Sequence, residues 1–153
     1  MIDQFIGSDC KLLEKTETCT LFECRNNQLE ETKFVAFYFS AHWCPPCRRF
    51  TPKLVEFYNN VNRDEKHFEV IFVSGDRTDE EFIKYYETMP WLALPLSETD
   101  RNENLQEKFG VQGIPMLVVI NTETGGIYTD ARSAVQNWNT DEDSYSVLTE
   151  WKS

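Results

Sequence analysis

Two cysteines separated by two prolines are the residues of this sequence best suited to chemistry. Cys44 and Cys47 lie in a segment that reads Trp-Cys-Pro-Pro-Cys. An apolar run precedes the segment and a helical pattern follows it, so we expect Cys44 at the N-terminus of a helix. Unpaired backbone N–H groups and the helix dipole stabilise an anion there. The pKa of Cys44 should therefore fall below the ~8.5 of a free cysteine, which favours attack of its thiolate on disulfides.

The spacing of the two cysteines suits a bond that forms and breaks readily. Residues i and i+3 of a helix lie on one face with Cβ atoms about 5–6 Å apart, whereas a disulfide needs about 3.5–4.5 Å. A loosely wound first turn can close this gap. Pro45 and Pro46 fix φ where helical N–H groups have no partner, and should stiffen the dithiol. We predict that Cys44 is the nucleophile and that Cys47, which lies deeper, resolves the mixed disulfide.

Two other interpretations of the cysteine pair predict different chemistry. A structural zinc site needs four ligands, and His42 and His67 do not stand at a metal-binding spacing from the pair. A permanent structural disulfide is the alternative in an oxidising compartment. We expect no metal and no bound cofactor. The other thiols are expected to be buried or packed in a strand, with redox sensing as the alternative; they are Cys10, Cys19 and Cys24.

A histidine and two arginines flank the dithiol. His42 lies two residues before Cys44 and is a candidate for tuning the thiol pKa or moving protons, the alternative being a loop histidine with a modest electrostatic effect. Arg48 and Arg49 either add positive field to the thiolate or form a solvated helix face.

The elements that must position the dithiol can be read from the hydrophobic pattern. Continuous apolar runs of strand length indicate strands that are buried on both faces. The residues from Thr78 to Glu81 form a capping box that starts a helix. We predict strands at 18–24, 33–40, 67–74, 116–120 and 127–129, and helices from the Cys-Pro-Pro-Cys turn to 61, from 78 to 89, around 105–109 and at 144–151. This order predicts an α/β fold, a central mixed sheet between helices, with an antiparallel hairpin near the C-terminus.

Composition excludes several classes of function. The chain has 153 residues, 41% of them hydrophobic, and a formal net charge of −11. This charge repels nucleic acid and anionic lipid, and the longest apolar runs, at 34–39 and 116–120, are far shorter than the ~20 residues that span a membrane. The N-terminus has no secretory signal pattern. We expect one domain over 1–153 with its core at about 30–130, a monomer, in the cytoplasm with the nucleus as a second compartment.

Several further segments add to the strand–dithiol–helix segment at 34–58. They are Val-Ser-Gly-Asp-Arg-Thr at 73–78, Tyr-Tyr at 85–86, Met-Pro-Trp-Leu-Ala-Leu-Pro at 89–95 and Phe-Gly-Val-Gln-Gly-Ile-Pro at 109–115. Together these segments resemble thioredoxin-fold proteins of the nucleoredoxin and tryparedoxin branch. The resemblance covers most of the chain and is weakest before 30 and after 130. It implies a thioredoxin fold with dithiol–disulfide exchange.

The resemblance also implies roles for three further residues. The Ile114–Pro115 peptide bond would be cis and face the dithiol, with the Ile114 backbone pairing with an extended substrate. Trp43 would shield the dithiol and offer an apolar surface to substrate. Ordinary thioredoxins carry a buried carboxylate that moves the proton of the second cysteine, and Tyr38 stands at that position here. A water chain or a nearby glutamate is then left as the acceptor for the Cys47 proton.

Two functions are therefore expected. The first is a thiol–disulfide oxidoreductase that reduces protein disulfides and is itself reduced by a partner that the sequence does not identify, either a reductase or a small thiol. The second, by resemblance, is a redox-sensing interaction module that binds signalling proteins according to its thiol state.

Overall fold

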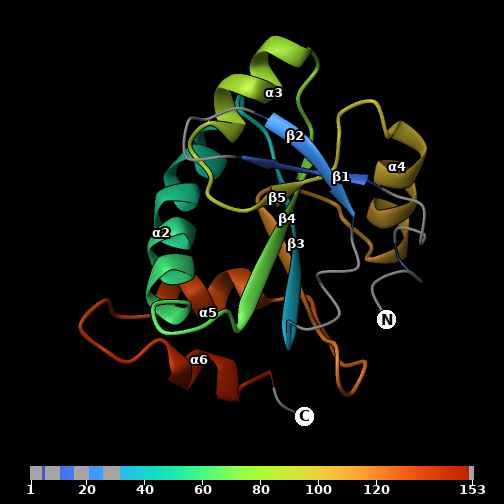
Figure 1. Ribbon diagram of the computed structural model, residues 1–153. Helices are drawn as coiled ribbons and strands as arrows, with labels where there is room; N and C mark the ends of the chain where they lie inside the picture. The colour runs from blue at the N-terminus through green and yellow to red at the C-terminus, as the bar shows by residue number, and fades with distance from the viewer. Residues whose placement is uncertain (1–4, 6–10, 16–20, 26–31, 152–153) are drawn as a thin grey trace.

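The computed structural model describes residues 5, 11–15, 21–25 and 32–151. In this part of the chain, seven strands form one mixed sheet in the order β2-β1-β5-β4-β3-β6-β7 (Figure 1). The strands are β1 (Lys11–Lys15), β2 (Leu21–Arg25), β3 (Phe34–Ser40), β4 (Phe68–Ser74), β5 (Leu92–Ala93), β6 (Met116–Asn121) and β7 (Ile127–Tyr128). The helices are α2 (Pro45–Val61), α3 (Asp79–Tyr86), α4 (Thr99–Lys108), α5 (Ala131–Asn137) and α6 (Tyr145–Thr149).

The three central strands form where the sequence is continuously apolar. All seven residues of β3 and all seven of β4 are buried, because helices cover both faces of the sheet. β3 pairs with β4 in parallel and with β6 in antiparallel orientation. The predictions of strands at 33–40, 67–74 and 116–120 are confirmed to within one residue.

Two hydrophobic layers enclose the sheet. One layer joins alternate residues of the central strands to the apolar faces of α2, α3, α5 and α6. The other packs the opposite face against α4 and Phe5. Figure 1 shows α2 and α4 on opposite sides of the sheet. This arrangement confirms the predicted sheet between helices.

The structure adds three elements that the sequence pattern did not indicate, which are β1, the two-residue strand β5 and α5. β1 pairs with β2 over five residues and with β5 through Leu13 and Ala93 alone. α5 buries only Ala131 and Val135, too few apolar positions for a helical period to stand out. The strand predicted at 18–24 begins at Leu21 among the described residues, and positions 18–20 lie outside them. The predicted C-terminal hairpin is confirmed, because β6 pairs with β7 through Val119 and Tyr128.

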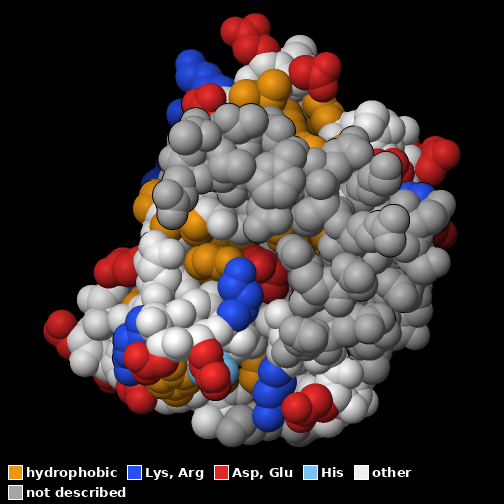
Figure 2. Space-filling view, in the orientation of Figure 1, with side chains coloured by type: hydrophobic (Ala, Val, Ile, Leu, Met, Phe, Trp, Pro, Cys, Tyr) orange, Lys and Arg blue, Asp and Glu red, His pale blue; other side chains and the backbone are white. Residues whose placement is uncertain are grey.

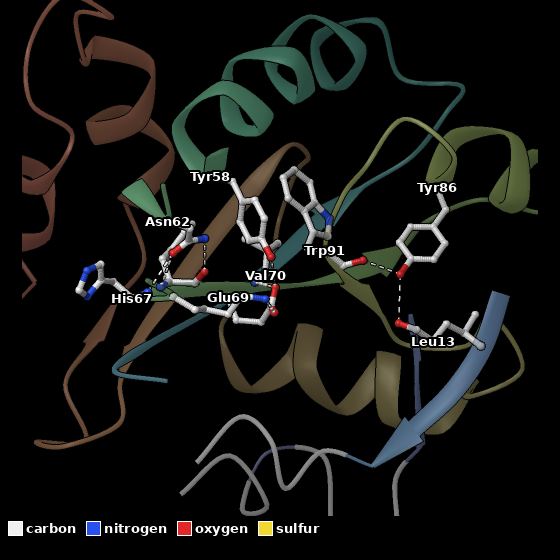
Figure 3. A network of polar contacts seen from close by, with 10 residues as sticks. Leu13, Tyr58, Asn62, His67, Glu69, Val70, Tyr86 and Trp91 are labelled. Carbon is white, nitrogen blue, oxygen red and sulfur yellow. Dashed lines mark hydrogen bonds and ion pairs between the residues drawn. The ribbon is translucent and has the colours of Figure 1, made fainter. Parts of the chain in front are cut away.

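Polar side chains form hydrogen bonds beside β4, where this strand extends past the short strand β5. The carboxylate of the buried Glu69 accepts hydrogen bonds from the Val70 backbone at 2.9 Å and the Tyr58 hydroxyl at 2.9 Å (Figure 3). The Lys66 ammonium donates a third hydrogen bond to this carboxylate at 2.8 Å. Nearby, the Tyr86 hydroxyl donates to the backbone carbonyl of Leu13 at 3.0 Å and also contacts that of Trp91. These bonds connect α2 to β4 and α3 to β1.

Charged side chains are distributed over the described surface. Acidic side chains are visible along several edges of the face in Figure 2, as expected for a net charge of −11. Among the helices of the described residues, none combines the length and apolarity needed to cross a bilayer.

Trp151 attaches the C-terminal segment to the core. Its ring stacks on Phe68 at 5.7 Å and meets Phe57 edge-on at 6.1 Å, and its backbone carbonyl accepts the Asn121 side-chain amide at 2.9 Å. Because the ring is only 2% exposed, Trp151→Ala should lower the free energy of unfolding by about 3–5 kcal/mol. Chemical denaturation measures this change. The exposed neighbour Glu150 supplies the control substitution, Glu150→Ala, and a Trp151→Ala loss below about 1 kcal/mol would contradict the assigned packing.

Candidate active site

Cys44 lies in the short loop between β3 and α2, immediately before the first residue of α2. It is the N-cap residue of α2, with Pro45 and Pro46 as the first helical residues. Its sulfur accepts the backbone N–H of Cys47 at 3.4 Å. The sulfur is thus placed at the unpaired amides of the helix start, which is where an anionic sulfur is stabilised.

The two sulfurs differ in access. The side chain of Cys44 is 5% exposed and that of Cys47 is fully buried. Both are free thiols and pack with Ala41, against which the half-buried Ile114 also lies. The difference in exposure is small. Its direction is the one expected if Cys44 contacts the substrate and Cys47 attacks from the protein interior.

A cis peptide bond faces the dithiol, as the resemblance implies. The Ile114–Pro115 bond is cis and directly precedes β6. The Cys44 thiol lies 3.8 Å from the backbone oxygen of Ile114. From α5, the Arg132 guanidinium donates to the backbone oxygen of Pro115 at 3.2 Å. Arg132 was not indicated by the sequence, because its contact depends on a helix that the pattern did not reveal.

The loop after β4 forms hydrogen bonds with the two residues that precede Cys44. The Asp76 carboxylate accepts the backbone N–H of His42 at 2.7 Å and the Ser74 hydroxyl at 2.8 Å. The indole N–H of Trp43 donates to the Gly75 carbonyl at 2.9 Å. The ring of Trp43 is still 46% exposed, so it is both fixed in orientation and open to a partner.

The imidazole of His42 packs edge-on against Tyr85, with ring centroids 5.7 Å apart. Its side chain therefore contacts α3, while its backbone contacts the loop after β4.

The structure brings His42, Trp43, Cys44 and Cys47 together with Ile114 and Pro115. Cys10 and Cys19 lie outside the described residues, and Cys24 is described only as a backbone position of β2.

The Cys47 thiol is difficult to ionise. Burial raises its pKa to about 11, and the hydrogen bond with Cys44 adds to the increase. Hydrogen bonds from the Ser40 side chain and the Ala41 backbone act in the opposite direction and favour the thiolate. Cys47 thus stays protonated at neutral pH until its environment or its reaction partner changes.

Tyr38 occupies the position where ordinary thioredoxins are expected to have a carboxylate. Its hydroxyl lies 2.7 Å from that of Thr51, which donates to the Cys47 backbone carbonyl at 2.9 Å. Burial raises the pKa of Tyr38 far above its usual value. The Tyr38 hydroxyl therefore remains protonated and does not accept the Cys47 proton at neutral pH.

Reduced protein should be alkylated selectively at Cys44. At pH 7 a thiol with a pKa of about 11 is about one part in ten thousand thiolate, and the Cys47 sulfur is also enclosed. We expect iodoacetamide to modify Cys44 at least about tenfold faster than Cys47. Tandem mass spectrometry of the tryptic 34–48 peptide separates the two sites. Protein unfolded in urea is the control, and equal rates in folded protein would contradict the described burial.

Comparison with known proteins places this geometry in a class. A helix that starts at a cysteine pair, a cis proline opposite it and a mixed sheet between helices define a thioredoxin-like protein. A family model described as Thioredoxin-like matches residues 31–127, and the chain belongs to this family.

Within the family, the chain is similar to nucleoredoxins and tryparedoxins. It is 46% identical over 107 residues to nucleoredoxin of Danio rerio, a match that covers 70% of this chain and 26% of that protein. It is 49% identical over 104 residues to tryparedoxin of Trypanosoma brucei brucei, covering 67% of this chain and 72% of that protein. The chain thus spans about a quarter of the length of the nucleoredoxin.

Solved structures agree with the sequence comparison. Tryparedoxin I from Leishmania major aligns over 99% of this chain and 98% of its own, with a TM-score of 0.79 and 35% identity. Tryparedoxin II complexed with glutathionylspermidine aligns over 88% of this chain and 90% of its own, with a TM-score of 0.78 and 38% identity. The suspected family and the thioredoxin fold are both confirmed.

Proposed function

We propose that this chain is a thiol–disulfide oxidoreductase that reduces protein disulfides. Membership of a family of thioredoxin-like oxidoreductases supports redox chemistry in general. The observation that carries the finer proposal is the position of Cys44. Its sulfur caps α2, accepts the Cys47 amide at 3.4 Å and faces the Ile114 carbonyl at 3.8 Å.

The proposed reaction has two exchange steps. The Cys44 thiolate attacks one sulfur of a substrate disulfide, forms a mixed disulfide and releases the first substrate thiolate. Cys47 then attacks the Cys44 sulfur, which forms the Cys44–Cys47 disulfide and releases the second thiolate. The proton of Cys47 ends on the departing thiol. Two electrons pass to the substrate, and a dithiol or two thiols must return them to the protein.

The neighbouring residues have proposed roles in binding and tuning. The open ring of Trp43 and the cis Ile114–Pro115 segment would hold an extended substrate beside Cys44. Pro45 and Pro46 would keep the first turn of α2 in a shape that both the dithiol and the disulfide tolerate. For the reductant we propose a small thiol; one tryparedoxin was solved with glutathionylspermidine. We place this activity in a reducing compartment, the cytoplasm and the nucleus.

Insulin reduction tests the proposal. With dithiothreitol as the electron source, the rate of insulin B-chain precipitation should rise in proportion to the concentration of the protein. A rate equal to that of dithiothreitol alone would refute the reductase function.

A further inference from the structure

Four buried hydroxyl groups form a connected cluster behind Cys47. They come from three elements and belong to Tyr38 and Ser40 of β3, Thr51 of α2 and Tyr85 of α3. The Tyr85 oxygen lies 2.6 Å from the Ser40 oxygen and 2.6 Å from the Thr51 oxygen. The Tyr38 and Thr51 oxygens are 2.7 Å apart. The cluster reaches the second cysteine through Thr51, which donates to the Cys47 carbonyl at 2.9 Å, and the Ser40 side chain lowers the pKa of the Cys47 thiol.

The cluster can hold its hydrogens in two arrangements. In three of its contacts either oxygen is able to donate. When Cys47 is a thiol, its S–H can donate to Ser40, Ser40 to Tyr85 and Tyr85 to Thr51. When Cys47 is a thiolate, Ser40 donates to the sulfur and Tyr85 donates to Ser40. Thr51 keeps its bond to the Cys47 carbonyl in both arrangements, so every hydroxyl hydrogen has an acceptor in each state.

The cluster supplies donors and does not take the proton. Burial raises the pKa of Tyr38 and that of Tyr85, so both hydroxyls stay protonated at neutral pH. The groups that shift the pKa of Cys47 are Cys44, Ser40 and Ala41, with no carboxylate among them. A buried thiolate needs such donors, because hydrogen bonds to a charged group are the strongest available in a protein interior.

We propose that the Ser40 hydroxyl, oriented by Tyr85, is the donor that stabilises the Cys47 thiolate while it attacks the mixed disulfide. This inference rests on the proposed function, in which Cys47 is the resolving thiol. In the step, the Cys47 sulfur bonds to the Cys44 sulfur, the Cys44–substrate bond breaks, and the departing thiolate takes the proton that Cys47 lost. In this proposal Ser40 acts on a reacting atom, the Cys47 sulfur, and Tyr85 is a positioning residue that acts through Ser40.

Ser40→Ala and Tyr85→Phe test this role. Reduced protein in excess over 5,5′-dithiobis(2-nitrobenzoate) should release thionitrobenzoate in two phases, the first from attack by Cys44 and the second from resolution by Cys47. One hydrogen bond to a charged group corresponds to roughly one pKa unit. We therefore expect the second phase to slow about tenfold at pH 7 in Ser40→Ala, with its pH–rate profile moved up by about one unit. Tyr85→Phe should shift the profile in the same direction by less.

Tyr86→Phe is the matched control, since it removes a buried tyrosine hydroxyl from the same helix. That hydroxyl bonds to the carbonyls of Leu13 and Trp91 and not to the dithiol cluster. It should leave both phases and the pH profile unchanged. A general loss of stability would instead affect Tyr85→Phe and Tyr86→Phe alike.

The two proposals fail in different ways. If wild-type protein gives a second phase that Cys47→Ser retains, Cys47 does not resolve, and the proposed function and this inference both fall. If the second phase depends on Cys47 but keeps its rate and pH profile in Ser40→Ala, only the role of the cluster is refuted. Ser40→Ala removes a single oxygen, so it decides the question even if Tyr85→Phe does not fold.

Discussion

Cys44→Ser should lower the rate of insulin reduction roughly a thousandfold or more, to the background of dithiothreitol alone. A serine hydroxyl at this position is neutral at pH 7 and is a poor nucleophile towards sulfur, so the first exchange step is lost. The fold should be unaffected, because oxygen replaces sulfur at a helix N-cap, where serine is itself a preferred residue. The measurement is the initial rate of insulin B-chain precipitation as a function of protein concentration.

Cys24→Ser is the matched control for the loss of a thiol. Cys24 belongs to β2, at the opposite end of the sheet order from the strands that adjoin the dithiol. This variant should retain wild-type activity. If Cys44→Ser kept more than about a tenth of the rate, or if Cys24→Ser lost as much, Cys44 would not be the nucleophile.

Cys47→Ser should stop the reaction after the first step. Cys44 can still attack, but the buried thiol that would displace the substrate is gone. An intramolecular thiol has a large effective concentration compared with millimolar dithiothreitol, so we expect turnover to fall roughly a hundredfold or more. The mixed disulfide should accumulate. With oxidised glutathione as substrate, intact-mass spectrometry should show the protein with one glutathione attached, and peptide mapping should place it on Cys44.

The combined variant Cys44→Ser/Cys47→Ser provides the control for this experiment. It should carry no glutathione under the same conditions, unless another cysteine reacts, which the peptide map identifies. Wild-type protein should pass to the internal disulfide instead of retaining glutathione. Retention of wild-type turnover by Cys47→Ser would show that the reductant resolves the mixed disulfide directly and that the second cysteine is not required.

Local sequence determined much of the fold. The strands β3, β4 and β6 follow from continuous apolar runs, because a strand covered by helices on both faces has no polar side. The start of α3 at Thr78 follows from its cap, whose hydroxyl accepts the Glu81 N–H at 3.2 Å. Tertiary packing was needed for β1, which meets β5 through a single pair of residues, and for α5, which buries two side chains.

For the site, the sequence by itself determined the dithiol, the helix that begins at Cys44 and, through family resemblance, the cis proline opposite. These features depend on residues that are adjacent in the chain or on motifs shared with relatives. Only the tertiary structure decided what surrounds Cys47. Tyr85 is 45 residues from Ser40 and 34 from Thr51, and no motif in the sequence connects these positions. The hydrogen-bond partner of a buried hydroxyl is known only from the tertiary structure, in which the sheet and two helices bring distant residues together. Hydrogen bonds depend on distance and direction in space and leave no period in the sequence.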